Sequence, residues 1–383
     1  MSDMNRQEME LLAELSDPDT AVVETLSQLQ GDIIFITEQG QSGHSIALMA
    51  KRAFEEADKT NRVIVAAHHF EEADQLEIQA DGIVAIQCDL TQVDALRELP
   101  DAAYVVYMVD GISPLIIPPV KTTQESIRAA GMACLLNVHT PALVATRYAD
   151  SCIVVLTNSE TAIRKFVLST PDADNNAEQD TDANNTQPFN ALTDEIPICE
   201  YDQAARSRES VFSYYAQTHG TPITLLRASS INEPRRGVLV DIATSILNQV
   251  PIDLAVSPIA PLWATDFHRI ALRSFANCNS PATKFNVTGP QLLSLHNAAE
   301  QLADALGQSP LYVNEPHPVT QSSIEAFDSN EHVLPSSEIT DEPEFHKEFM
   351  INRISSWLLE GNPVWSPTDL DDKLNEHPDQ AAQ

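Results

Sequence analysis

Short apolar runs alternate with amphipathic stretches along the first 230 residues. A β-branched run at 32–37 leads into a turn with two glycines, and an amphipathic stretch follows from His44 to about Ala57. Strand, glycine turn and helix in this order open a βαβ unit. Five more runs predict strands, at 63–67, 82–87, 103–109, 151–156 and 222–226. Uninterrupted apolar strands separated by helices predict an α/β fold with a doubly wound parallel Rossmann sheet.

The same pattern suggests how the chain is divided. Four parts are predicted: an N-terminal helical extension (1–30), a Rossmann dinucleotide-binding-type domain (31–227), a smaller C-terminal α/β substrate-type domain (228–360) and an acidic tail (361–383). In the C-terminal part, the pattern predicts a strand at 284–287 and helices at 294–306 and 345–359. Residues 171–187 contain five acids and no base, which predicts a flexible loop.

The charge of the chain narrows the classes of partner. The formal net charge is −34, which argues against binding nucleic acid or anionic lipid because both need a basic surface. An adaptation to salt and an attraction for basic protein partners both stay open. The five cysteines are scattered without a CxxC, so neither a disulfide framework nor a metal site is indicated. With no signal-peptide pattern and no apolar stretch of membrane-spanning length, we expect a cytoplasmic protein.

Four stretches of sequence carry a family resemblance. They are Gln87–Thr91 (QCDLT), Tyr201–Arg227, Pro261–Leu272, and Phe285–Pro290 (FNVTGP) with the following Leu293-Ser294. Together they resemble the extended short-chain dehydrogenase/reductase family, which includes nucleotide-sugar epimerases, dehydratases and reductases. The likeness runs from about residue 31 to residue 313. It implies an NAD or NADP cofactor. It also implies a homodimer that pairs the helices expected at 124–137 and 201–215.

The glycine turn departs from the family pattern Thr-Gly-x-x-Gly-x-x-Gly. Thr37 is present, Glu38 stands in place of the first glycine, one residue is missing, and Gly40 and Gly43 form the later pair around Ser42. A carboxylate at this point repels a pyrophosphate and blocks the close approach that glycine allows. Two interpretations stay open: a surviving nucleotide site, or glycines that only shape the turn and let the helix pack on the strand.

Other cofactor positions are mixed. The second strand ends in His68-His69 without the acid that contacts an NAD ribose. His68 is either a phosphate contact or an ordinary loop residue. Asp89 matches the family residue that contacts the adenine edge. The predicted cofactor residues are Thr37, Gly40, Ser42, Gly43, His68 and Asp89. From the damage to the turn we expect weak or absent NAD or NADP binding.

The catalytic positions are also altered. The family uses a Ser or Thr, a Tyr as acid/base, and a Lys four residues after the Tyr. Tyr201 matches the tyrosine, but the lysine position is Ala205, which leaves Tyr201 a poor base at neutral pH. Asn158 takes the Ser/Thr position, and Thr157 or Ser159 replaces it if the alignment shifts by one residue. Alternatively, Tyr201 only packs against the next element.

These lesions predict a non-catalytic or atypical member that acts as a binding or structural subunit, with itself or another protein as partner. Two alternatives remain: an active NAD(P)-dependent epimerase, dehydratase or reductase that uses displaced residues such as Ser159, Tyr201 and Arg206, and a dinucleotide-sensing regulator of the NmrA type. Whether the chain is an enzyme is left open at this point.

Overall fold

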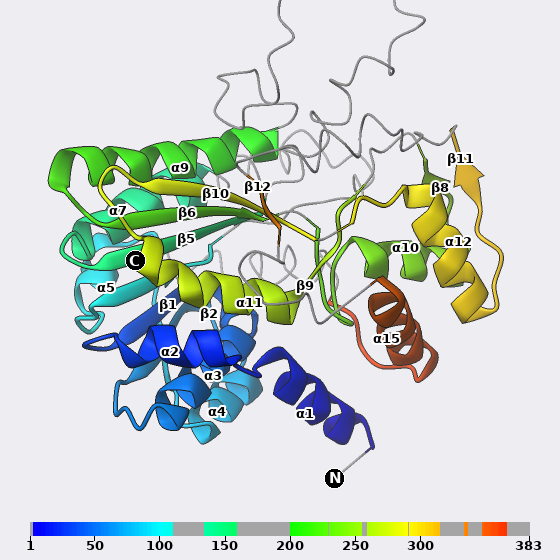
Figure 1. Cartoon of the computed structure of the whole chain (residues 1–383), viewed down its shortest axis with the longest axis horizontal. Coiled ribbons are helices and arrows are strands. Elements are labelled where there is room, and N and C mark those ends of the chain that lie inside the picture. The colour runs from blue at the N-terminus through cyan, green and yellow to red at the C-terminus, as the bar shows by residue number, and fades with distance from the viewer. Residues whose placement is uncertain are drawn as a thin grey trace, which may run out of the picture.

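A parallel sheet forms the centre of the molecule. The computed structural model describes residues 3–109, 134–158, 200–228, 230–254, 259–289, 291–314, 333–335 and 347–365. The sheet contains β1 (Ile33–Gln39), β2 (Val63–His69), β3 (Val84–Gln87), β4 (Tyr104–Tyr107), β5 (Cys152–Asn158), β6 (Ile223–Ala228), β10 (Thr283–Thr288) and β12 (Val333–Pro335). Their order is β12-β10-β6-β5-β4-β1-β2-β3, and every neighbouring pair is parallel (Figure 1).

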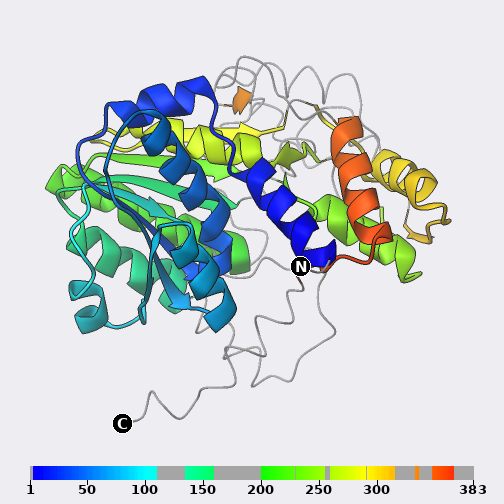
Figure 2. The same ribbon diagram turned by 90° about the horizontal axis from the view of Figure 1, so that it is seen from below.

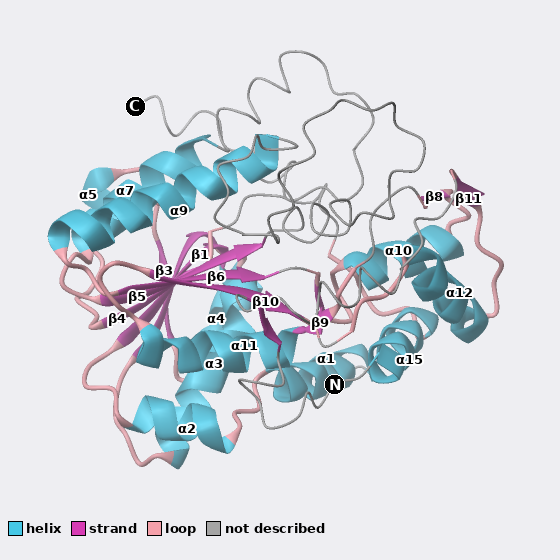
Figure 3. Cartoon of the chain, turned by 45° about the horizontal axis from the view of Figure 1, so that its top comes forward, coloured by secondary structure: helices cyan, strands magenta, loops and turns pink. Residues whose placement is uncertain are grey.

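Helices cover both faces of this sheet (Figure 3). One face carries α2 (Thr20–Ser27), α3 (Gly40–Glu56), α4 (Glu72–Ala80) and α11 (Ala264–Arg273), and the other carries α5 (Val93–Arg97), α7 (Thr140–Arg147) and α9 (Glu200–His219). Along β1, Ile33 and Phe35 pack in the core on the α3 side of the sheet, whereas Ile34 and Ile36 pack in the core on the α9 side. Side chains buried on both faces explain why the strands appear as uninterrupted apolar runs. The predicted doubly wound α/β fold is confirmed.

A third apolar core lies beside the sheet. It is built from α10 (Val238–Leu247), α12 (Leu295–Leu306) and α15 (Lys347–Leu359). Two short parallel pairs accompany these helices: β7 (Ile231–Asn232) with β9 (Leu262–Trp263), and β8 (Ile252–Asp253) with β11 (Tyr312–Val313). After β9 and before α12, the chain returns to the main sheet as β10, which matches the strand predicted at 284–287. The predicted limits of the two domains stay a prediction.

The N-terminal extension forms two helices rather than one. α1 (Asp3–Leu15) ends before Asp19, whose carboxylate accepts a hydrogen bond from Val22 N at 2.7 Å and so begins α2. Leu11 and Leu15 of α1 are fully buried against Ala264 and Trp357. In Figure 2, α1 lies between the sheet layer and α15. Leu11 and Leu15 thus face the protein interior, whereas Met9 is exposed.

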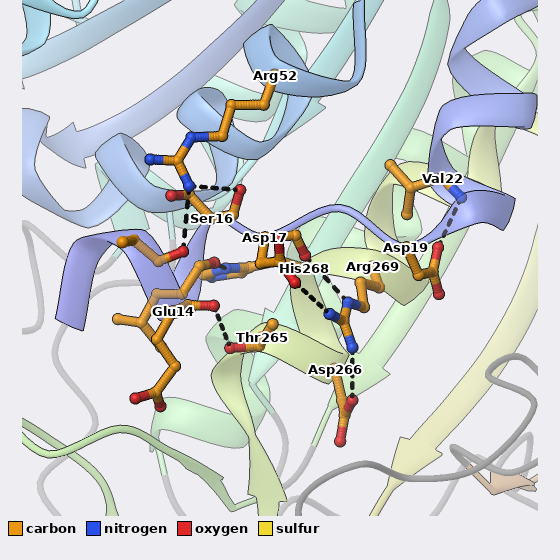
Figure 4. Close-up of polar contacts among 12 residues, drawn as sticks. Glu14, Ser16, Asp17, Asp19, Val22, Arg52, Thr265, Asp266, His268 and Arg269 are labelled. Atoms are coloured by element: carbon orange, nitrogen blue, oxygen red, sulfur yellow. Dashed lines mark hydrogen bonds and ion pairs between the residues drawn. The ribbon is translucent and has the colours of Figure 1, made fainter. Parts of the chain in front are cut away.

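Polar contacts fasten the end of α1 to α11 (Figure 4). The Glu14 carbonyl accepts from Thr265 Oγ1 at 3.2 Å, and the Leu15 carbonyl accepts from His268 Nδ1 at 3.0 Å. Arg269 Nε donates to the Asp17 carbonyl at 3.1 Å. The Glu14 carboxylate also accepts from the indole of the buried Trp263 and from Arg353. The extension is therefore an integral part of the fold.

Some predictions fall on residues outside this description. They include the flexible loop at 171–187, most of the acidic tail, and Ser159. None of the helices within the described ranges combines the length and the apolar character needed to cross a membrane.

Candidate functional site

The carboxyl end of β1 passes directly into α3. β1 pairs with β2 as far as Gln39 and His69, and α3 begins at the next residue, Gly40. Gln39 is extended (φ −124°, ψ 138°), and its side chain makes no capping hydrogen bond. The buried Thr37 donates its hydroxyl to the Gln39 carbonyl at 3.1 Å. The sequence placed the helix start at His44; the structure starts it at Gly40, so the expected glycine turn is the first turn of the helix.

The two glycines of this junction lie against side chains. A β-carbon at Gly40 would come within 2.0 Å of Cε1 in the Phe70 ring, and one at Gly43 within 3.3 Å of Thr37 Cγ2. Phe70 follows β2 and is only 6% exposed. The absence of a β-carbon at Gly40 thus lets the Phe70 ring pack directly on α3, whereas a β-carbon at Gly43 would need only a small shift of Thr37. A nucleotide role for Gly40, Gly43 and the neighbouring Ser42 stays a prediction.

His68 and Asp89 meet at the neighbouring strand ends. His68 Nδ1 accepts a hydrogen bond from Leu90 N at 3.2 Å and lies 3.5 Å from Asp89 Oδ1. Burial lowers the pKa of His68, although the charge of Asp89 acts in the opposite direction. The lowered pKa favours the neutral ring, and Nδ1 can accept a hydrogen bond from Leu90 N only in that form. Asp89 is half exposed and accepts from the amide and hydroxyl of Thr91 at 3.0 and 2.7 Å. The contacts of His68 therefore hold the loop that carries Asp89.

The predicted catalytic positions lie at β5 and α9. Asn158 is the last residue of β5 and Tyr201 the second residue of α9, but the side chains of both lie outside the description. Ala205 is buried, so an apolar methyl occupies the position of the family lysine. Thr157 is 1% exposed, and its hydroxyl has no hydrogen-bond partner within the described residues. Such an unsatisfied buried hydroxyl is uncommon.

Arg208 is a buried cation that the sequence analysis missed. It lies three residues after Ala205 on the same helix face and is fully buried. Nε and Nη2 donate to Asn137 Oδ1 at 3.1 and 2.5 Å, and Nη1 donates to the Leu156 carbonyl at 3.0 Å. Asn137 belongs to a π turn, η1 (Leu135–His139). The charge of Arg208 is therefore fixed one helical turn beyond the position of the family lysine. The sequence does contain a sign of this buried cation, because Arg208 stands on the apolar face of the helix.

Further polar groups line the same face of β5, β6 and β10. Arg227 of β6 stands in register with Thr157 on one side and Asn286 on the other. Its guanidinium pairs with Glu209 of α9, with Nε 2.7 Å from Oε1. Asn286 Oδ1 and Thr288 Oγ1 are buried and, like the Thr157 hydroxyl, have no hydrogen-bond partner among the described residues.

The structure brings the two predicted sets to one edge of the sheet. The cofactor candidates lie at the carboxyl ends of β1, β2 and β3, and the catalytic candidates at the carboxyl end of β5 and the start of α9. In open α/β sheets ligands bind at this edge. Within the described residues, no group of three His, Cys, Asp or Glu side chains could hold a metal ion.

Comparison with known proteins places the fold. No family model and no curated protein matches the sequence. Among solved structures, a UDP-galactose 4-epimerase superimposes with a TM-score of 0.57 at 15% identity, over 87% of this chain and 100% of that one. The enzyme WbmF of Bordetella bronchiseptica, in complex with NAD+ and UDP, has a TM-score of 0.56 at 14% identity, over 93% and 98% of the two chains. A dTDP-glucose 4,6-dehydratase of Bacillus anthracis, in complex with NAD, has a TM-score of 0.55 at 14% identity, over 86% and 97%.

The chain has the fold of these epimerase and dehydratase structures. The fold that the sequence resemblance implied is confirmed. At this level of identity the likeness concerns architecture alone, and what the site does must be argued from its own residues.

Proposed function

We propose that this chain is a non-catalytic or atypical Rossmann protein that acts as a binding or structural subunit and holds NAD or NADP weakly or not at all. The observation that carries the proposal is the Phe70 ring packed on Gly40 at a junction without a connecting loop. Solved structures of the same fold contain NAD. A pyrophosphate bound at the helix N-terminus would need close approach to the backbone at this junction.

Charge supports the same conclusion. Glu38 lies two residues before the helix, at the strand end that a pyrophosphate would approach. At a partly desolvated site its repulsion of the phosphates is worth about 1–4 kcal/mol. On the catalytic side, Ala205 offers no cation to Tyr201, and the buried guanidinium of Arg208 is committed to Asn137 and Leu156. Both halves of the usual reaction are weakened independently.

Isothermal titration against NAD and NADP tests the proposal. We expect no micromolar binding by the wild type, and a larger gain from Glu38→Gly than from Ala205→Lys. Asp150→Gly is the matched control, since it removes the same charge from an exposed turn before β5, at the opposite edge of the sheet. Micromolar binding by the wild type would contradict the proposal; binding without turnover would then favour a dinucleotide sensor of the NmrA type.

A second candidate, an active NAD(P)-dependent epimerase, dehydratase or reductase, is favoured by one observation. The buried hydroxyl of Thr157 has no partner among the described residues, as expected of a group that waits for a substrate oxygen. Such an enzyme would change the nicotinamide absorbance when mixed with cofactor and nucleotide sugars, and Thr157→Val would abolish that change.

We further propose that the subunit is a homodimer. Leu135, Val138 and Tyr214 are exposed on the adjoining η1 and α9 segments. Leu136 and Phe212, from the same two segments, lie in the core. Light scattering should give twice the chain mass in high salt, with weaker association in low salt because of the −34 charge. A monomer under both conditions would refute this.

A further inference from the structure

Two cysteines lie together at the amino-terminal edge of the sheet, away from the site described above. Cys152 is the first residue of β5, and Cys278 follows the short helix η3 (Ser274–Asn277). Both pack on the α3 side of the sheet and both are partly exposed. An antiparallel bridge between Ile223 of β6 and Asn279 fixes the position of Cys278. The pair is therefore held by regular backbone pairing.

The contacts of the two thiols overlap. Cys278 Sγ lies 3.6 Å from the Ile153 carbonyl, next along the chain from Cys152, and 3.8 Å from the Ser274 carbonyl. Cys152 Sγ lies 3.9 Å from the carbonyl of Phe275 in η3. Each sulfur thus reaches the segment that carries the other.

The surroundings make the two thiols unequal. The neighbouring Cys152 thiol lowers the pKa of Cys278 against the effect of burial. The Thr224 hydroxyl, whose Oγ1 lies 3.5 Å from Cys278 Sγ, acts in the same direction because it can donate to the thiolate. The neighbouring Cys278 thiol, together with burial, raises the pKa of Cys152. By contrast, Cys88 is buried in the core, and burial raises its pKa to about 11. Because the Thr224 hydroxyl lies beside its sulfur, we take Cys278 as the nucleophile of the pair.

We propose that Cys152 and Cys278 form an oxidisable thiol pair that hydrogen peroxide closes to a disulfide, joining η3 to β5. The Cys278 thiolate attacks one peroxide oxygen; an S–O bond forms, the O–O bond breaks, and hydroxide leaves. The Cys152 thiol then attacks this sulfenic acid. An S–S bond forms, the S–O bond breaks, and the thiol proton leaves with the hydroxide as water. The hydroxide from the first step takes up the proton that Cys278 released on ionising. The two thiols are thus oxidised by two electrons, and the peroxide is reduced to two molecules of water.

The disulfide would connect the sheet to the segment that follows α11. Because α11 holds the N-terminal helix, the bond would fasten β5, η3 and α11 into one unit. It lies at the sheet edge opposite the nucleotide-type site, so the proposal does not depend on cofactor binding. It assigns a modification site to a pair of side chains that the proposed function does not use.

Alkylation and mass spectrometry of the full chain test this inference. In a Cys134→Ser, Cys199→Ser background, three cysteines remain. The reduced protein is treated with hydrogen peroxide, quenched with catalase, denatured and alkylated with N-ethylmaleimide. We expect the number of alkylated cysteines to fall from three to one, with Cys88 as the internal control. A peptide linking Cys152 to Cys278 should appear, and dithiothreitol should restore all three sites.

Two variants separate the roles of the sulfurs. Cys152→Ser should leave a sulfenic acid on Cys278 that dimedone traps, whereas Cys278→Ser should leave Cys152 unlabelled. Peptide mapping of the oxidised wild-type chain gives the same answer without any substitution. Alkylation of all three cysteines after peroxide, a cross-link that involves Cys88, or sulfinic acid on Cys278 without a cross-link would each overturn the proposal.

Discussion

Adding one methyl group at Gly40 should destabilise the protein through Phe70. The β-carbon of Gly40→Ala would lie 2.0 and 2.2 Å from two carbons of the Phe70 ring, far inside contact distance. The ring would have to leave a place in which it is only 6% exposed. Overpacking of this kind costs about 1–3 kcal/mol, whereas Phe70→Ala alone removes a buried ring at a cost of about 3–5 kcal/mol.

The double variant tests the cause. Phe70→Ala removes the three atoms that lie nearest to the methyl group at Gly40. We therefore expect the loss in the double variant to be smaller than the sum of the single losses, by about 0.5–3 kcal/mol. Gly43→Ala is the control, because its nearest neighbours are Thr37 and Val65, the closest at 3.3 Å. It should cost less than Gly40→Ala and show no coupling to Phe70.

Urea unfolding at constant salt, followed by tryptophan fluorescence and far-UV circular dichroism, gives the free energies of unfolding. Additive losses for Gly40→Ala and Phe70→Ala would refute the reasoning, because they would mean that the ring does not occupy the space above Gly40. The junction would then be open to a ligand, and the main support for weak nucleotide binding would be lost.

Two further predictions concern the bracing of the N-terminal segment. Burial lowers the pKa of His268 from 6.5 to about 4, so the folded protein loses stability as the pH falls from 6.5 towards 4. His268→Asn keeps a donor for the Leu15 carbonyl but does not titrate in this range. We expect it to remove about 3 kcal/mol of the difference in unfolding free energy between pH 7 and pH 4. Unchanged pH dependence would contradict this. Glu14→Ala should cost about 1–3 kcal/mol because it removes the carboxylate that accepts from the buried indole of Trp263 and from Arg353. Glu10→Ala, at an exposed position, should change stability by less than about 0.5 kcal/mol, and equal losses in urea unfolding would contradict the assigned contacts.

The sheet could be predicted because its chemistry is local. Runs such as 63–67 and 222–226 are apolar on both faces of the sheet, and each predicted strand appears within a few residues of its expected place. The start of α3 was wrong because Gly40 and Gly43 have two physical uses, in a turn and in a closely packed helix, and sequence alone does not distinguish them. α11 has no start signal of its own: Trp263 precedes it without a capping side chain.

The candidate site was harder to predict for a different reason. The lesions at Glu38 and Ala205 follow from single positions, and these were visible. The groups that characterise the site, Phe70 on Gly40 and Arg208 on Asn137, are contacts between residues 30 and 71 positions apart. Spacing within one helix or strand says nothing about such pairs. They follow only from the register of the sheet and from the helix faces packed on it.

The docking of α1 on α11 also has a consequence for the order of folding. The bonds from Trp263, Thr265 and His268 to Glu14 and Leu15 span 249 to 253 positions of sequence. During translation α1 leaves the ribosome before α11, and its binding surface is synthesised only about 250 residues later. Contacts of such long range carry a large loop-closure cost and form late. A helix that is made before its binding surface thus docks late, and until then the apolar side chains of Leu11 and Leu15 stay exposed to solvent.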